Sequence, residues 1–139
     1  MIKIKSNLDI IYYAHSLNIY DTDKEKAELK TIRNIYTQAL IINPNGWIAQ
    51  NMSPSNIMEQ CYLYAGKICN ILIFSADNNC IIGKGVYEEI KKGIENHRKV
   101  LFMHKEKFSN FSKKDFNNIK MLYNSTGSWK KYAQIKVNI

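Results

Sequence analysis

The sequence predicts a single α/β domain with a mostly parallel sheet, and three observations support this fold class. The chain has 139 residues, which suffices for one domain but is marginal for two. Its composition is 45% hydrophobic and 23% charged, as in globular proteins rather than disordered or fibrous ones. Short apolar segments alternate with amphipathic segments of about 10–15 residues, the pattern of βαβ units. We therefore treat residues 1–139 as one domain.

Apolar segments rich in β-forming residues are expected to be the strands. Residues 70–74, NILIF, are the most apolar and are predicted to form the central strand. The other strands are expected at residues 8–14, 38–42 and 99–103, with candidate strands at 132–137 and, as an edge, at 1–5. Parallel strands with helices on both faces give a Rossmann-like or flavodoxin-like three-layer sandwich, here with about four to five strands.

Helix-start signals place the helices between these strands. Thr22 and Glu25 form a capping-box pattern for a helix ending near Tyr36, and Ser53-Pro54 begins the next helix. Further helices are expected over 86–97 and, from a capping box of Ser112 and Asp115, over 112–123, whereas 43–46 and 75–85 are expected to be loops. The side chains predicted to face the core are Ala27, Ile32 and Ile35 in the first helix, Ile57, Cys61, Ala65 and Ile68 in the second, and Val86, Ile90 and Ile94 in the third.

The net charge of +8 is concentrated in the C-terminal part of the chain. Residues 84–139 carry 13 basic and 5 acidic side chains, whereas residues 1–83 carry 7 of each. The lysines are scattered and no motif directs them into a groove, so nucleic acid is not expected as a partner. A solvated basic face is the simplest interpretation, and its field would still attract anionic substrates such as nucleotides.

Targeting and redox signals favour a soluble cytoplasmic protein. No apolar run approaches the roughly 18 residues that span a bilayer, and the opening MIKIKSNLD lacks the apolar stretch of a signal peptide. The three cysteines, Cys61, Cys69 and Cys80, form no C-x-x-C pair and are expected to be buried thiols. They show no zinc spacing with the histidines, so neither a metal nor a cofactor is expected.

Ligands of parallel α/β sheets bind at the carboxyl ends of the strands. This rule directs attention to residues 13–18, 43–47 and 75–89. The last region contains Gly83-Lys84-Gly85, which lacks the spacing of a Walker loop or a dinucleotide fingerprint. It does lead into a predicted helix start, where glycines and free N–H groups allow a ligand to approach the backbone.

Two adjacent acids follow this loop, and helical periodicity separates them. At about 100° per residue, Glu89 lies beside the buried stripe of Val86 and Ile90, while Glu88 points roughly the opposite way. An acid on the sheet side of a helix is costly unless it has a function. Glu89 is therefore the candidate chemical group, and Glu88 is interpreted as a solvated acid favoured by the helix dipole.

Residues 85–100, GVYEEIKKGIENHRKV, resemble the helix-and-strand signature of the nucleoside 2-deoxyribosyltransferase and nucleotide N-glycosidase superfamily. That signature has a glycine, a catalytic glutamate, an aliphatic residue, a small residue four places after the glutamate, and a basic turn into the next strand. Here these positions are Gly85, Glu89, Ile90, Gly93 and residues 96–99. Glu88 stands where members usually carry an aromatic residue, and Tyr87 comes one place earlier.

Residues 11–16, IYYAHS, are similar to the opening strand of the same family. The resemblance implies that Tyr12 orients the catalytic glutamate and that Ser16 lies near a substrate phosphate. The candidate catalytic residues are thus Glu89 and Tyr12, and the candidate substrate-binding residues are His15, Ser16, Asn43, Trp47, Asp77, Gly85 and Tyr87. The alternatives are a structural role for His15 and packing in the core or at a subunit contact for Trp47. Because such families often assemble with a neighbour completing the site, a homodimer or larger homo-oligomer is expected.

The resemblance implies cleavage of the N-glycosidic bond of a nucleoside or nucleotide, by hydrolysis or by deoxyribosyl transfer. A carboxylate beneath C1′ would stabilise or attack the electron-poor carbon, and the helix N-terminus and the tyrosine hydroxyl are expected to keep it ionised. TIR domains show a similar pattern over residues 89–100, so an NAD nucleosidase or cyclase is an alternative. A non-catalytic nucleotide sensor or sponge of the same fold is another.

Overall fold

The computed structural model describes residues 8–48, 52–123 and 129–135. Its main sheet has the strand order β2-β1-β3-β5-β6, and a second, smaller sheet has the order β4-β8-β7. The strands of the main sheet are β1 (Ile10–Ala14), β2 (Leu40–Ile42), β3 (Ile71–Ser75), β5 (Lys99–His104) and β6 (Lys107–Asn110), and those of the small sheet are β4 (Ile81–Gly83), β7 (Lys120–Tyr123) and β8 (Trp129–Gln134). The first four strands of the main sheet pair in parallel, which confirms the predicted α/β fold with β3 at its centre.

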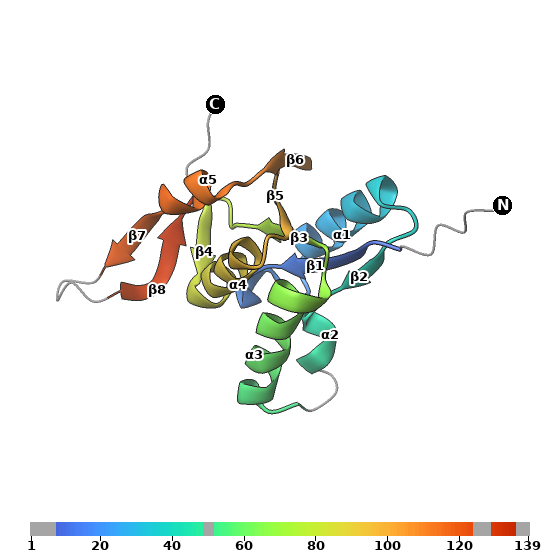
Figure 1. Cartoon of the computed structure of the whole chain (residues 1–139), viewed down its shortest axis with the longest axis horizontal. Helices are drawn as coiled ribbons and strands as arrows, with labels where there is room; N and C mark the ends of the chain where they lie inside the picture. Colours follow the sequence, from blue (N-terminus) through green and yellow to red (C-terminus); the bar gives the residue numbers. More distant parts are fainter. Residues whose placement is uncertain (1–7, 49–51, 124–128, 136–139) are drawn as a thin grey trace.

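Helices cover both faces of the main sheet, as a three-layer sandwich requires (Figure 1). The helical segments are η1 (Leu17–Ile19), α1 (Asp23–Ile35), α2 (Asn45–Ile48), α3 (Pro54–Leu63), the π-helical turn η2 (Tyr64–Ile68), α4 (Lys84–Glu95) and α5 (Lys113–Asn117). Successive β1 side chains face opposite sides, so Ile11 and Tyr13 pack with Ile32 of α1. Tyr12 and Ala14 pack on the other face with Ile90 of α4.

The helix-start signals are confirmed at three helices, but the capping box predicted from Thr22 and Glu25 is only half formed, because the Thr22 N–H donates to Ile19 O instead of to the Glu25 carboxylate. The Thr22 hydroxyl accepts a hydrogen bond from the Glu25 N–H at the start of α1, and the Ser53 hydroxyl accepts one from the Asn56 N–H at the start of α3. Ser112 and Asp115 form a complete capping box at α5. Each of these bonds satisfies a backbone donor that the helix itself leaves free, which is why the starts could be read from sequence.

Three of the side chains predicted to face the core are instead exposed. On α1, Ile32 is buried, but Ala27 and Ile35 are exposed, and the inward face carries two glutamates. Ile68 is 38% exposed because it lies in the π-helical turn η2, whose wider winding rotates side chains away from the stripe that an α-helix would give. Cys69 is buried, while Cys61 and Cys80 are only partly so.

The C-terminal region departs most from the prediction. The helix expected to reach residue 123 ends at Asn117, after which the chain forms β7. The expected loop 75–85 contains β4, and the strand expected at 132–137 is β8, which pairs antiparallel with both β4 and β7. This three-stranded sheet lies beside α4 (Figure 1). The candidate edge strand at 1–5 lies outside the described residues.

Candidate active site

A cavity of about 550 Å³ opens at the carboxyl ends of β1 and β3. The chain leaves β1 toward one edge of the sheet and β3 toward the other, so this is the switch point where α/β proteins bind ligands. The cavity lies between the β1–α1 connection, α3 and the start of α4. Its lining residues are His15, Ser16, Leu17, Asn18, Tyr20, Ile57, Met58, Cys61, Tyr62, Asp77, Ile81, Ile82, Gly83, Lys84, Gly85, Val86 and Glu89.

Glu89 is the buried acid of this cavity. The helical phase of α4 turns it inward with Val86 and Ile90, and it is 6% exposed. Its Oε2 atom makes no hydrogen bond with any described residue. Burial raises the pKa of Glu89 to about 8, and the nearby Tyr12 hydroxyl only partly opposes this shift. Burial therefore opposes the ionised form that the sequence analysis expected for Glu89 at neutral pH.

Two further groups, Tyr12 and Cys61, interact with this carboxyl group. Tyr12 is fully buried in β1, and its hydroxyl, like Glu89 Oε2, has no hydrogen-bond partner among the described residues. Burial and the neighbouring Glu89 charge raise the pKa of Tyr12 above its usual value, and they raise the pKa of the Cys61 thiol to about 12. At neutral pH the three groups form an uncharged or singly charged cluster in which two polar atoms lack partners.

The β1–η1 loop also lines the cavity, and it contacts the start of α4. The Ser16 hydroxyl accepts a hydrogen bond of 3.2 Å from the N–H of Gly83, the N-cap residue of α4. His15 is buried, and its ring lies between those of Tyr13 and Tyr20. Gly85, in the first turn of α4, has no atom within 4 Å of the position that a Cβ would take, so the backbone there is open to a ligand.

The structure brings some of the predicted site residues together and leaves others apart. His15, Ser16, Asp77, Gly85 and Glu89 line the cavity, with Tyr12 behind Glu89. Asp77 also holds its own turn, because its Oδ1 accepts hydrogen bonds from the N–H groups of Asn79 at 2.8 Å and Ile81 at 3.0 Å.

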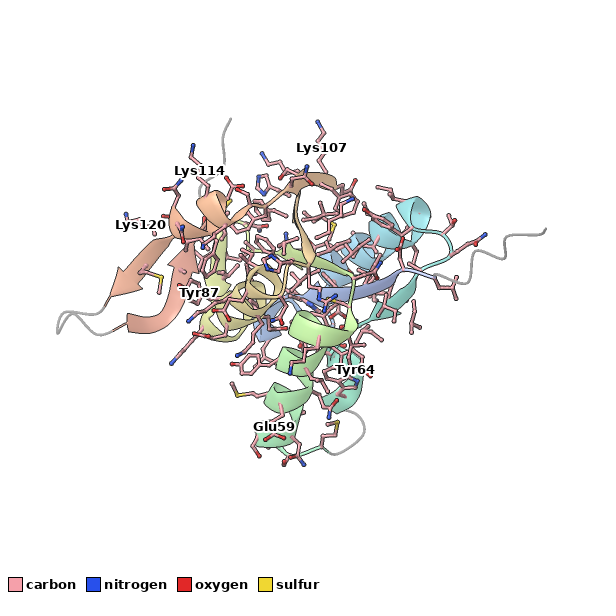
Figure 2. The ribbon with its side chains drawn as sticks, in the orientation of Figure 1. Glu59, Tyr64, Tyr87, Lys107, Lys114 and Lys120 are labelled. Atoms are coloured by element: carbon pink, nitrogen blue, oxygen red, sulfur yellow. The ribbon has the colours of Figure 1, made fainter. Side chains whose placement is uncertain are left out.

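Asn43, Trp47 and Tyr87 do not line the cavity. The Asn43 Oδ1 accepts from the N–H of Asn45, a local turn bond. The Trp47 ring packs between those of Tyr12 and Tyr64, with centroid distances of 6.5 and 5.3 Å. Tyr87 stacks on Phe116 of α5 at 4.9 Å, on the side of the small sheet (Figure 2). These three residues lie near strand ends in the sequence, but their side chains contact other residues instead of lining the cavity.

Sequence reasoning missed several lining residues. Cys61 was placed on the buried face of its helix, but no signal distinguished a cavity wall from the core. Tyr20, Tyr62 and Met58 lie on segments that the strand-end rule did not select. Lys84 lay within the selected loop and could have been included as a cation beside the glycines. Among the described residues, no cluster of three or more histidine, cysteine or acidic side chains could hold a metal ion.

Comparison with known proteins adds no assignment to this geometry. The sequence matches neither a protein-family model nor a curated protein. No helix in the described part of the chain combines the length and apolar character needed to cross a bilayer. The functional assignment therefore depends on the chemistry of the cavity itself.

Proposed function

We propose that this protein cleaves the N-glycosidic bond of a nucleoside or nucleotide, with Glu89 as the group that meets C1′. The observation that carries the proposal is a buried carboxyl group at the sheet's switch point. It lines the cavity, and its Oε2 has no partner among the residues that the structure describes. A buried polar atom without a partner is destabilising, so its presence indicates a ligand that supplies the missing interaction. Strongly shifted pKa values in a cleft are typical of functional groups.

The size and lining of the cavity fit a substrate of this class. Small-molecule sites commonly enclose about 300–1,000 Å³ behind mostly apolar walls with a few polar groups. Here the volume is about 550 Å³, and the apolar and aromatic wall includes Ile57, Tyr20 and Tyr62, against which a base could pack. Lys84 and the first N–H groups of α4 offer positive potential to a phosphate.

The chemistry assigned to Glu89 follows from its surroundings. When the C1′–N bond breaks, positive charge develops on the sugar, and the base leaves with the electron pair and takes up a proton. An ionised Glu89 would stabilise that charge or form a bond to C1′. Water would then attack C1′, displacing the carboxylate where that bond had formed, and the proton that the water loses balances the one that the base takes up. A carboxylate that is shielded from solvent, with one oxygen unpartnered among the described residues, gains more from the developing charge than a solvated one would.

The test is base release from a defined substrate panel. The purified protein is incubated with ribo- and deoxyribonucleosides, their 5′-monophosphates and NAD, and free base or nicotinamide is followed by chromatography. We expect release from at least one nucleoside or nucleotide and none with E89Q. Release of nicotinamide alone would favour the NAD-cleaving alternative. Tight binding without release would overturn the enzymatic proposal in favour of a nucleotide sensor.

A further inference from the structure

The proposed reaction does not use a second set of buried ionisable groups, which comprises two glutamates of α1 and His15 at the cavity wall. Glu25 and Glu28 of α1 are 5% and 6% exposed, and His15 is 3% exposed. Acids and histidines are seldom so deeply buried unless they are paired, and all three are paired here. Glu25 and Glu28 have different hydrogen-bond partners, and we therefore assign them different roles.

Glu25 joins three connections that meet at the carboxyl ends of the strands. Its Oε2 lies 2.7 Å from His15 Nε2 in the β1–η1 loop. Its Oε1 accepts from the backbone N–H of Asp21 at 3.3 Å in the η1–α1 turn. Both oxygens accept from the Asn45 side-chain amide at the start of α2, at 3.0 and 3.2 Å. One carboxyl group thus fixes several loops around the cavity mouth.

His15 connects Glu25 to the wall of the cavity, because it contacts Glu25 and itself lines the cavity. Its Nδ1 lies 3.1 Å from the Tyr13 carbonyl oxygen, and its Nε2 faces Glu25. Its ring stacks on Tyr13 at 3.8 Å with 10° between the planes. Both nitrogens therefore face protein partners, and the ring is held in one orientation. The next residue, Ser16, binds the Gly83 N–H at the start of the helix that bears Glu89.

Glu28 lies one turn further along α1 and is not among the residues that line the cavity. Its Oε1 accepts from the Tyr13 hydroxyl at 2.5 Å and from the Ser75 hydroxyl at 2.7 Å, and its Oε2 lies 3.5 Å from Lys24 Nζ. It is as buried as Glu25 and equally well bonded, but it connects α1 to the strands rather than to the loops. Glu28 is therefore a matched internal control.

We propose that Glu25 is a positioning residue, which through His15 sets the place of the Ser16 loop against the start of α4 and so governs substrate binding at the cavity. It touches neither the proposed substrate nor Glu89. Loss of Glu25 should loosen the Ser16–Gly83 contact and weaken binding, while the chemical step at Glu89 proceeds at nearly its normal rate. The kinetic part of this inference rests on the proposed function, but the structural part does not.

The first experiment measures amide hydrogen exchange at Gly83 in wild type, E25A, E25Q, E28A and E28Q, and needs no activity. We expect E25A to reduce protection of the Gly83 amide about tenfold and E25Q, which keeps a hydrogen-bonding group, to reduce it less. The E28A and E28Q variants should leave it within about twofold. Equal losses in the Glu25 and Glu28 series would overturn the proposal, since they would indicate general loosening of α1. If E25A does not fold, the comparison of E25Q with E28Q decides.

The second experiment uses the nucleoside or nucleotide that the panel identifies. For E25Q we expect KM to rise about tenfold with kcat within about twofold, as for other residues that orient a contact group. E28Q should change neither constant. A fall in kcat with unchanged KM would contradict the positioning role. If wild type releases no base, the proposed function fails, and the exchange measurement still decides whether Glu25 positions the loop.

Discussion

At the scale of single residues, the central feature is the competition between burial and ionisation at Glu89. Burial raises its pKa to about 8 from a reference value of 4.5. The reactive form proposed here is the carboxylate, so kcat/KM should rise with pH and level off above about pH 8. Measuring kcat/KM between pH 6 and 9 tests this, and a rate that falls across this range would mean that the protonated acid is the active form.

The same pKa predicts a pH-dependent stability. Above about pH 4.5 the unfolded chain loses the Glu89 proton while the folded protein retains it up to about pH 8, so stability falls with rising pH across that window. E89Q cannot ionise and should melt above wild type, by a gap that widens from pH 5 to 8, reaches roughly several degrees and then stays constant. E88Q controls for the loss of a charge on α4. A gap for E89Q that does not change with pH would contradict the raised pKa.

Tyr12 provides a separate test of the cluster. Because its buried hydroxyl has no hydrogen-bond partner in the described part of the chain, Y12F should leave the melting temperature unchanged or raise it slightly. The nearby hydroxyl lowers the pKa of Glu89, so its loss should shift the pH profile of kcat/KM to higher pH and reduce kcat about tenfold. Calorimetry and a pH–rate series would check both parts. Normal kcat with a large loss of stability would mean that Tyr12 only packs.

At the scale of elements, the position of Glu89 depends on how closely α4 approaches the sheet. Gly93 lies one turn after Glu89, and a Cβ there would meet Leu72 Cδ1 at 3.1 Å and Val100 Cγ2 at 3.4 Å. This close approach explains in packing terms why a small residue suits that position. G93V should therefore destabilise the fold by about 1–3 kcal/mol and displace α4 enough to reduce activity.

Gly85 gives the matched comparison on the same helix. A Cβ at Gly85 has nothing within 4 Å, so G85A should fold with at least wild-type stability. It lines the cavity, and the added methyl group should raise KM if substrate approaches the backbone there. Denaturant unfolding and kinetics of both variants would separate helix packing from ligand contact. A destabilised G85A or a fully stable G93V would contradict this description of α4.

The elements also show how far the sequence can predict the structure. Alternating apolar and amphipathic segments sufficed for β1, β3, β5 and the sandwich, because burial on both sheet faces leaves a strong pattern. Of the small sheet only the candidate strand at 132–137 was predicted, because the strands are short and the pairing joins residues 81–83 to 132–134, about 50 apart in sequence. The π-helical turn likewise left no signal in helical periodicity.

The candidate site likewise combines features that the sequence predicted with features that it did not. Helical phase predicted that Glu89 would face inward and Glu88 would not, and Glu88 is indeed only half-buried. The pKa of Glu89 was not predictable, since it depends on how completely several elements exclude solvent. Glu25 and Glu28 were missed because an inward helical face is expected to be apolar, and Glu25 had been interpreted as a capping residue. Buried acids of this kind can be recognised only when a structure shows the groups that they bind.

At the scale of the whole molecule, the uneven charge predicts electrostatic steering. Lys107, Lys114 and Lys120 are exposed on β6, α5 and β7, along one side of the molecule, whereas Glu59 lies at the opposite end of the view (Figure 2). A positive field increases the encounter rate with anionic substrates and is screened by salt, with a Debye length of about 10 Å at 0.1 M.

The kinetic consequence of this field is measurable. For an anionic substrate, kcat/KM should fall several-fold between low salt and about 0.3 M NaCl, with kcat unchanged. A K107E/K114E/K120E variant should show a lower kcat/KM at low salt and a weaker salt dependence. A neutral nucleoside serves as the control substrate. Equal salt effects on neutral and anionic substrates would contradict steering by this face.

The most direct test compares E89Q with E88Q in base release from the best substrate of the panel. These adjacent glutamates allow the same substitution one position apart, the first buried in the cavity and the second half-buried outside it. We predict that E89Q folds and loses at least about a thousandfold in kcat, while E88Q stays within about twofold of wild type. Normal turnover by E89Q, or loss of turnover confined to E88Q, would contradict the assignment of Glu89 as the group that meets C1′.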